Sequence, residues 1–421
     1  MTSSTHTPAL AARHDLRING ERLWTSLMDL AKVGATPLGG VRRLALTDLD
    51  RAGRDLVVSW MREAGLTVRI DQIGNIFGRR AGTDPARKAV ASGSHIDTQP
   101  SGGRFDGNYG VLAALEVVRT LNEHNISTAA PIEIAIWTNE EGTRFTPVMM
   151  GSGAYAGVFE LADVLAARDL DGLAVGDELT RIGYAGDTPL GAEPLDAYFE
   201  AHIEQGPILE DRGLPIGIVT GALGQRWFDV TVTGMDAHAG PTPMPLRRDA
   251  GLAMARIIEA VNAIALAEAP DGRGTVGYVQ IGPNSRNVIP GSASFSVDLR
   301  HPHQEGLLRM DAALREQAAA VATSTRTRIE VRQVVEFPPC AFDQHCVDLV
   351  REAAQTHDLP HLDIVSGAGH DAVYVARVAP TAMIFVPCKD GISHNEIEDA
   401  SPDDIEAGAN VLLTAMLGRA G

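Results

Sequence analysis

The sequence predicts an α/β protein in which the larger domain has a mixed, largely parallel sheet flanked by helices and carries a smaller, inserted α+β domain. Three observations support this fold class. Apolar strand-like runs alternate with helix-like segments early in the chain, an order typical of parallel sheets. The middle of the chain instead alternates apolar and polar residues, as in a sheet with one solvent-facing side. The chain has 421 residues, more than one hydrophobic core usually organises.

The early part of the chain shows the helix and strand pattern in order. Residues 50–64 have the apolar spacing of a helix, and two short strand-like segments follow, up to residue 80. The small apolar run AVAS (89–92) precedes a glycine-rich loop, and a helix is expected from residue 109. IEIAIWT (132–138) is β-branched and nearly all apolar, as expected of a strand buried on both faces.

The middle of the chain predicts a separate domain. GQRWFDVTVTG (224–234) and ASFSVDLR (293–300) have the two-residue period of strands, and helices are expected at 247–268 and 304–322. The resulting order of strand, helix, strand, strand, helix, strand is that of a ferredoxin-like α+β domain. We therefore predict an inserted domain at 222–333 and a discontinuous larger domain made of 1–221 and 334–421.

Composition excludes several classes of function. The net charge of −18 argues against a surface for nucleic acid or for anionic membranes, so an acidic substrate needs a local arginine. The three cysteines form neither a CxxC pair nor a disulfide framework, which favours a reducing cytoplasm. The first twenty residues lack the apolar core of a signal peptide, and charged or polar residues interrupt the apolar stretch 251–269, so no transmembrane span is expected.

The loop GSHIDTQPSGGRFDG (93–107) is the first candidate functional segment. Its glycines allow backbone angles that other residues resist, and its aspartates can cap a helix. However, the loop follows a predicted strand of a parallel sheet, where ligands bind. His95 stands two residues before Asp97, a spacing at which a carboxylate can steady a metal-binding imidazole.

Other histidines and carboxylates recur at predicted strand ends. Imidazole and carboxylate ligands suit zinc, manganese, cobalt or nickel, and one carboxylate can bridge two ions. Taken singly, a histidine is more often a helix-end or core polar group, and the Glu140–Glu141 pair can be a solvated helix start. The residues that together favour a metal site are His95, Asp97, Asp106, Glu140, Glu141, His202 and His394.

Other chemistries are less well supported. The sequence has no Gly-Lys pair of a Walker-type phosphate loop and no GxSxG nucleophile elbow. GSGAYAG at 151 follows no clear strand with dinucleotide-binding spacing, and Cys388 has no base assigned by sequence.

Seven motifs resemble those of the hydantoinase/carbamoylase amidases, a branch of the metallo-aminoacylase and carboxypeptidase clan. The resemblance covers nearly the whole chain, and the motifs occur in the order of that family. They are GSHIDTQPSGGRFDG, TNEEGTRF, HIEQGPILE, MDAHAGPTPMPLRRDA, GPNSRNVIPG, SGAGHDA and SHNEIE.

The resemblance implies a site with two divalent metal ions per subunit, zinc or manganese, with cobalt or nickel as alternatives. The implied ligands are His95, Asp106 as the bridge, Glu141, His202 and His394. The implied catalytic residues are Glu140 as the general base, His238 as a group that stabilises the oxyanion, and Asp97 as the carboxylate that steadies His95. The smaller domain is implied to be a dimerisation and lid domain that sends His238 into the neighbouring subunit's site of a homodimer. The implied substrate-binding residues are Gln205, His238, Asn287 and Arg300.

The resemblance also implies hydrolysis of a ureido acid. QPSGGRFDG, with Arg104, and the segment GATPLGGVRRLALTDLD look more like β-ureidopropionases, which favours N-carbamoyl-β-alanine as substrate. Arg300 ends a predicted strand, and its guanidinium can hold the substrate carboxylate with two parallel bonds. N-carbamoyl-L-α-amino acids, allantoate and dipeptides or acylated amino acids remain alternatives, as does a non-catalytic binding protein on the same fold.

Overall fold

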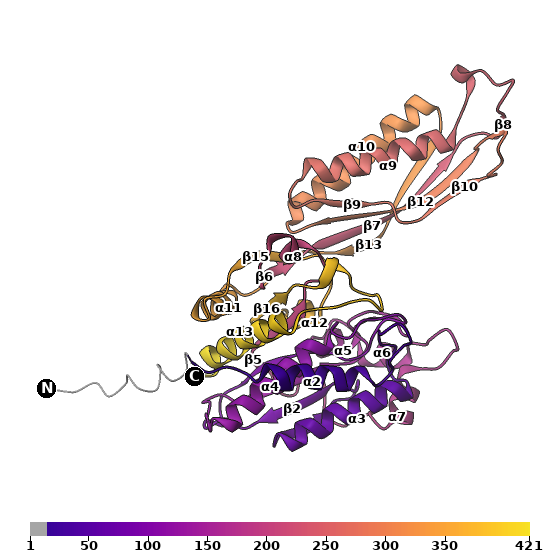
Figure 1. Cartoon of the computed structure of the whole chain (residues 1–421). Coiled ribbons are helices and arrows are strands. Elements are labelled where there is room, and N and C mark those ends of the chain that lie inside the picture. Colours follow the sequence, from indigo (N-terminus) through magenta and orange to yellow (C-terminus); the bar gives the residue numbers. More distant parts are fainter. Residues whose placement is uncertain (1–14) are drawn as a thin grey trace. The chain divides into compact units, whose positions relative to one another are not determined.

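The computed structural model describes residues 15–421, which form two compact units (Figure 1). Unit 1 contains the described residues up to Thr220 and those from Phe342 to Gly421, and unit 2 is the continuous segment Gly221–Ala341. Most of the stretch inspected above for a signal peptide lies outside the described residues. The chain thus leaves unit 1, forms unit 2 and returns to finish unit 1.

Unit 1 is built on a mixed sheet. Its central strands β4, β3, β5 and β16 are parallel neighbours in that order, while the pairs β1–β2, β2–β4 and β6–β16 are antiparallel. The strands are β1 (Thr67–Ile70), β2 (Ile76–Arg80), β3 (Ala89–His95), β4 (Ile132–Trp137), β5 (Leu195–Ile203), β6 (Ile216–Ala222), β15 (His361–Ser366) and β16 (Thr381–Val386). The predicted mixed α/β architecture with a parallel-rich sheet is confirmed.

Helices cover this sheet. α4 and α13 pack on β3 and β5, and α5 and α12 contact each other beside β4, β5 and β16. Every residue of β3, β4 and β16 is buried, which explains their near-continuous apolar or small sequences. The helices of unit 1 are α2 (Gly20–Ala31), α3 (Asp48–Glu63), α4 (Asn108–Glu123), α5 (Met150–Tyr155), α6 (Leu161–Ala166), α7 (Val175–Ile182), α8 (Ile208–Arg212), α11 (Gln344–Thr356), α12 (Asp371–Val375) and α13 (Pro402–Ala420), with a 3-10 turn η2 (Lys389–Gly391).

Unit 2 is an antiparallel sheet packed against two helices. The strands lie in the order β10, β12, β7, β13, and β9 also pairs with β12. Alternate residues of β7 and β12 are buried, and they form one core with the inner faces of α9 and α10. The elements are β7 (Gly224–Thr233), β8 (Ala237–His238), η1 (Met244–Leu246), α9 (Ala250–Ala267), β9 (Arg273–Thr275), β10 (Val279–Gly282), β11 (Val288–Ile289), β12 (Ser292–His301), α10 (Gln304–Thr325), β13 (Arg328–Phe337) and β14 (Cys340–Ala341).

The second unit extends beyond residue 333, where the sequence placed the boundary. β13 continues to Phe337, which pairs with Gln225 at the start of β7. The pairing of β13 with β7 shifts register at a bulge between Gln333 and Val335.

Within residues 15–421, one helix is long and apolar enough to cross a membrane when judged by length and composition alone. It is α9, the apolar stretch discussed above. Ala253, Ile257, Val261 and Ile264 of this helix lie in the core of unit 2, and such a core helix passes the same test.

Candidate metal centre

Most of the predicted ligands lie at one edge of the unit 1 sheet. His95 is the last residue of β3, Glu141 follows β4, and His202 is the penultimate residue of β5. These strands are parallel, so their carboxyl ends meet at this edge. Asp106 comes from the loop between β3 and α4, and His394 comes from the loop after β16.

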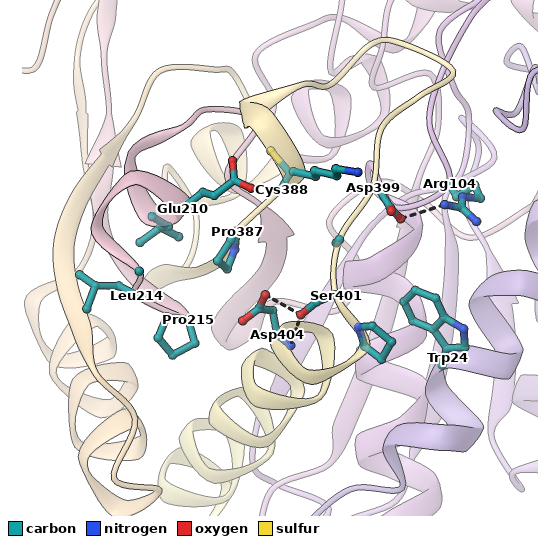
Figure 2. Close-up of a pocket in the computed structure, with 15 residues that line it drawn as sticks. Trp24, Arg104, Glu210, Leu214, Pro215, Pro387, Cys388, Asp399, Ser401 and Asp404 are labelled. Carbon is teal, nitrogen blue, oxygen red and sulfur yellow. Dashed lines mark hydrogen bonds and ion pairs between the residues drawn. The ribbon is translucent and has the colours of Figure 1, made fainter.

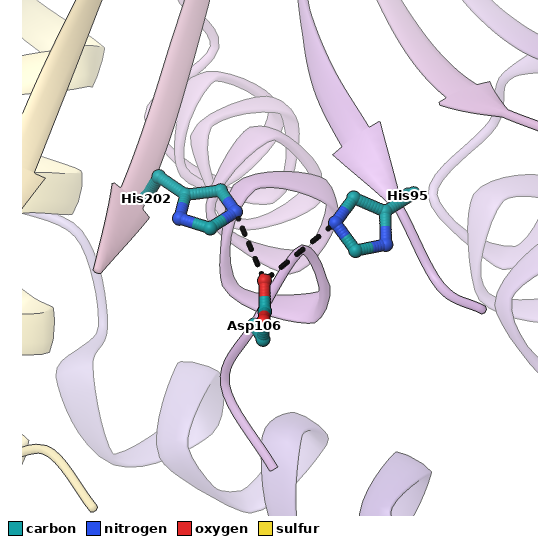
Figure 3. A group of neighbouring side chains, drawn as sticks. All are labelled: His95, Asp106 and His202. Carbon is teal, nitrogen blue, oxygen red and sulfur yellow. Dashed lines mark ion pairs between the residues drawn. The ribbon is translucent and has the colours of Figure 1, made fainter. Parts of the chain in front are cut away.

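Asp106 stands between two groups of side chains that can each hold a metal ion. Its Oδ1 lies 3.3 Å from Nε2 of His202 and 3.7 Å from Nε2 of His95 (Figure 3). Its Oδ2 lies 3.3 Å from Nε2 of His394, which is 3.4 Å from Oε2 of Glu141. Within each group the ligand atoms all lie within 4.8 Å of one another. The carboxylate of Asp106 therefore belongs to both groups of candidate ligands.

Glu140 lies beside the centre but belongs to neither group of ligands. Its Oε2 is 3.6 Å from Nε2 of His95. The carboxylate of Asp97 accepts the backbone N–H groups of Glu140 and Glu141, both at 3.3 Å. The backbone carbonyl of Asp97, rather than its carboxylate, contacts Nδ1 of His95 at 2.9 Å. Asp97 therefore holds the Glu140–Glu141 turn with its side chain and orients the imidazole with its main chain.

Burial and neighbouring charges set the protonation of the site. Burial raises the pKa of Glu140, and the carboxylates of Asp371 and Glu141 raise it further. Burial lowers the pKa of His95 to about 4, so its imidazole is neutral at pH 7, as a metal ligand must be. Hydrogen bonds from His202 and His394 overcome burial and lower the pKa of Asp106.

The glycine-rich loop fits closely around these side chains. A Cβ atom on Gly107 would lie 2.4 Å from the ring of His95, and Gly107 has a φ of +66°. A Cβ on Gly103 would lie 2.0 Å from the carboxyl group of Glu398. The two glycines thus let the backbone pass close to the side chains of His95 and Glu398, and they also allow the loop to turn. Two non-glycine residues at the site, Gln205 and His394, also have positive φ, which is uncommon outside functional loops.

Gln205, predicted to bind substrate, lies inside the centre. Its Nε2 donates to Oδ2 of Asp106 at 3.0 Å and lies 3.4 Å from Nε2 of His394. Ser393 also donates to Oδ2 of Asp106, at 3.1 Å. The second oxygen of the shared carboxylate is therefore surrounded by donors.

Two further residues were missed although they lie in quoted motifs. Glu398 of SHNEIE accepts the backbone N–H groups of Phe105 and Asp106, at 2.9 and 3.1 Å, and also accepts from Ser393. His370 of SGAGHDA packs edge-on against His202, with 4.5 Å between the ring centroids. His370, His202 and Glu200 form a third buried group with metal-ligand geometry, which shares His202 with the first group. For Glu398 and His370, the only signal in the sequence was their place within these two motifs.

Arg104 lies outside the metal centre. Its Nη2 donates to Oδ1 of Asp399 at 2.9 Å, and both residues line a cavity of about 730 Å³ together with Trp24 and Cys388 (Figure 2). None of the predicted metal ligands lines this cavity. The Arg104 side chain, which distinguishes this motif, therefore pairs with Asp399 rather than with a predicted metal ligand.

The remaining predicted substrate residues belong to unit 2. His238 in β8 and Asn287 before β11 are exposed, and the N–H of Ala239 donates to the carbonyl of Asn287 at 2.9 Å. Arg300 near the end of β12 donates through Nε and Nη2 to the carboxylate of Asp298. Arg300 pairs with Gln225 at the start of β7, whereas β8 follows the other end of that strand.

The donors at the unit 1 site fit a divalent transition metal. Three imidazoles and the carboxylate of Glu141 gather around Asp106, and these are the ligands that zinc, manganese, cobalt and nickel accept. The chain therefore has residues that can hold metal and a separate carboxylate, Glu140, that can move a proton.

Comparison with protein families gives a match over most of the chain. The model of peptidase family M20/M25/M40 matches residues 91–418. An N-carbamoyl-L-amino-acid amidohydrolase of Rhizobium meliloti is 49% identical over 401 residues, covering 95% of this chain and 96% of the relative. A ureidoglycolate hydrolase of Arabidopsis thaliana is 37% identical, covering 94% of this chain and 86% of the relative.

Solved structures agree with this grouping. A hydantoinase/carbamoylase family amidase from Burkholderia multivorans has a TM-score of 0.95 and 60% identity, covering 96% of this chain and 98% of the other. An aminopeptidase PepT from Bacillus cereus, at 17% identity and a TM-score of 0.63, shares the fold alone.

Proposed function

Because the chain belongs to the hydantoinase/carbamoylase amidases of peptidase family M20/M25/M40 and is a hydrolase of C–N amide bonds, we propose that it cleaves N-carbamoyl-L-α-amino acids. The products are the free amino acid, carbon dioxide and ammonia. The observation that carries the proposal is the pair of ligand groups joined by Asp106, with Glu140 beside them. The similarity to the N-carbamoyl-L-amino-acid amidohydrolase of Rhizobium meliloti supports the substrate class.

N-carbamoyl-β-alanine is the second candidate substrate. Arg104 is part of the motif that resembles β-ureidopropionases, but its side chain is paired with Asp399 in a cavity lined by none of the predicted ligands. The two substrates differ by one methylene, which contributes only about 1 to 3 kcal/mol of discrimination in a pocket. The position of the substrate carboxylate, more than the size of the substrate, must therefore determine which of the two is preferred.

The metal centre is proposed to hold two divalent ions, zinc or manganese, one in each group around Asp106. Such ions supply Lewis acidity that polarises the ureido carbonyl and makes water acidic near pH 7. Glu140 accepts a proton from the attacking water, and its raised pKa lets it keep that proton and deliver it to the leaving nitrogen. Asp97 keeps Glu140 in place through the backbone bond described above.

Unit 2 is proposed to be a ferredoxin-like dimerisation and lid domain. Gln225 and Thr233, at the two ends of β7, are about 26 Å apart at about 3.3 Å per residue. Arg300 lies at the first end and His238 beyond the second. We propose that Arg300 binds the substrate carboxylate, and that His238 and Asn287 serve the neighbouring subunit of a homodimer. Exposed apolar side chains on α9 and next to the edge strand β10, such as Leu266, Tyr278 and Val279, support an interface there.

The test of the proposed function is ammonia release by the Mn²⁺- or Zn²⁺-loaded protein. The substrates are N-carbamoyl-L-alanine, its D enantiomer, N-carbamoyl-β-alanine, allantoate and a dipeptide. Preference for N-carbamoyl-L-alanine is expected. Faster release from N-carbamoyl-β-alanine would move the substrate to the β-ureido acid, and cleavage of the dipeptide alone would overturn the ureido proposal. Sedimentation of the same sample tests the dimer, and a monomer at micromolar concentration would contradict it.

A further inference from the structure

Arg43 is a fully buried arginine in the segment between α2 and α3. Its Nε donates to the carbonyl of Ile96 at 2.8 Å, and its Nη1 donates to the carbonyls of Leu30 and Val33 at 3.1 and 2.7 Å. Its Nη2 donates to Oδ1 of Asn108 at 2.6 Å. Each of these acceptors is a neutral oxygen. A buried cation that hydrogen bonds only to neutral acceptors is costly, so its position needs a reason.

Two of these acceptors adjoin metal ligands. Ile96 directly follows His95, and Asn108 stands two residues after Asp106. The amide Nδ2 of Asn108 donates to the carbonyl of Asp106 at 3.1 Å. Because a guanidinium can only donate, Arg43 forces Oδ1 of Asn108 toward itself and leaves the NH₂ group facing Asp106. One side chain thus determines the hydrogen bonding at both ligand segments.

The backbone near Arg43 supports the same loop independently of the side chain. Arg43 donates its N–H to Oγ1 of Thr98 at 2.8 Å and accepts the N–H of Thr98 at 3.0 Å. Val41 and Gly102 exchange backbone bonds of 2.9 and 3.1 Å. These contacts remain when the guanidinium is replaced, so a conservative variant keeps a path to the native fold.

We infer that Arg43 is a positioning residue for the metal centre, holding the His95 turn through Ile96 and the Asp106 loop through Asn108. The inference rests on the proposed metal centre and goes beyond it, because it gives a role to a residue that is no ligand. It also gives the GATPLGGVRRLALTDLD segment a function other than substrate choice. Loss of a group that hydrogen-bonds a metal ligand directly typically lowers metal affinity by about 10- to 100-fold. Arg43 acts on two ligand segments through their neighbours, and we take the same range as the expected effect.

Arg80, which is half-buried, provides a control for replacing an arginine by a lysine. Its Nε donates to Oδ1 of Asn122 at 2.8 Å and its Nη2 to the carbonyl of Ile126 at 2.6 Å. These are the same kinds of acceptor that Arg43 uses, but neither residue adjoins a ligand. A lysine at either position keeps the charge and loses the fork of donors.

The experiment compares Arg43→Lys with Arg80→Lys in the full-length protein. Metal is removed by chelation, and Co²⁺ is titrated while its visible absorption is followed. We expect Arg43→Lys to raise the half-saturating Co²⁺ concentration by about 10- to 100-fold and to alter the spectrum. Arg80→Lys is expected to change neither. The unfolding temperature of the metal-free proteins reports general stability. Equal Co²⁺ binding by wild type and Arg43→Lys, or equal weakening by the two variants, would overturn the inference.

Asn108→Asp tests the same route from its other end and replaces the first test if Arg43→Lys does not fold. The carboxylate still accepts from Arg43, but it cannot donate to the carbonyl of Asp106. Weaker Co²⁺ binding is expected. Where Arg43→Lys folds, the double variant Arg43→Lys/Asn108→Asp should raise the half-saturating Co²⁺ concentration by less than the product of the two single fold-changes. Multiplicative effects would contradict a shared route. Failure of the wild type to bind Co²⁺ would overturn the metal centre itself, whereas normal binding by all variants would overturn only the role of Arg43.

Discussion

Glu140 and Glu141 are adjacent in the sequence but have different surroundings. Glu141 lies in a ligand group with Asp106 and His394, and it also accepts from Gln99 at 2.6 Å. Glu140 belongs to neither group that contains Asp106, although burial raises the pKa of both glutamates. Their substitutions should therefore affect different measurements.

Glu140→Gln is expected to lower kcat for ureido hydrolysis by about 10² to 10⁴, because the amide cannot accept a proton. Metal content after gel filtration should equal that of the wild type. Glu141→Gln is the control, since it should lose metal together with activity. Full activity in Glu140→Gln would show that another group takes the proton.

Asp71 offers a pH-dependent stability test away from the ligands. Burial raises the pKa of Asp71 from 3.8 to about 6, although Asn75 and Ile73 donate hydrogen bonds to it. Between these values the folded state holds a proton that the unfolded chain releases. The stabilisation is thus complete below about pH 4 and is lost as pH rises through 6.

The measurement is the free energy of unfolding of wild type minus that of Asp71→Asn between pH 4 and 8. Asparagine does not titrate, so the difference should fall by about 3 kcal/mol as pH rises through this range. A difference that is flat or rises with pH would mean that the hydrogen bonds keep Asp71 ionised.

At the scale of single residues, the sequence indicated which side chains lie together only where a motif contained them. The metal ligands came from the family resemblance, and the structure brings them together. The sequence could not show where the Arg104 side chain points, because its hydrogen-bond partner Asp399 lies almost 300 positions later. The same is true of Glu398, whose contacts with the Asp106 loop join distant parts of the chain.

α9 illustrates how an element of unit 2 is stabilised. Ile257 is fully buried between this helix and the sheet, whereas Glu259 on the same helix is exposed. Ile257→Ala is expected to destabilise unit 2 by about 2 to 5 kcal/mol, and Glu259→Ala by much less. Calorimetry should show a lower unfolding temperature for unit 2 with unchanged metal content in unit 1. Equal effects of the two substitutions would contradict this packing.

Elements were predictable where their burial leaves a pattern. β7 and β12 have one buried face, so their alternation is visible in the sequence. α13 has buried residues on all sides, and no 3.6-residue period marks it, so no prediction covered it. β16 is a run of six buried residues, which periodicity alone cannot distinguish from a buried helix segment.

At the scale of the whole molecule, metal removal should affect the two units differently. All candidate ligands around Asp106 belong to unit 1. A metal present at 100 times its dissociation constant stabilises the folded state that binds it by about 2.7 kcal/mol. Chelation is therefore expected to lower the unfolding temperature of unit 1 and to leave that of unit 2 unchanged. Identical shifts in both calorimetric transitions would show that the units do not unfold separately.

The insertion of unit 2 also imposes an order on biosynthesis. Unit 2 is one continuous segment, so the ribosome delivers all of its strands and helices before the second part of unit 1. The parallel sheet of unit 1 lacks β16 until residue 386 has been made, and the second ligand group lacks His394. The inserted segment can fold while its host is still incomplete. The growing chain therefore carries Asp106 for almost 290 further residues, and His95 for almost 300, before it can acquire a full set of candidate ligands.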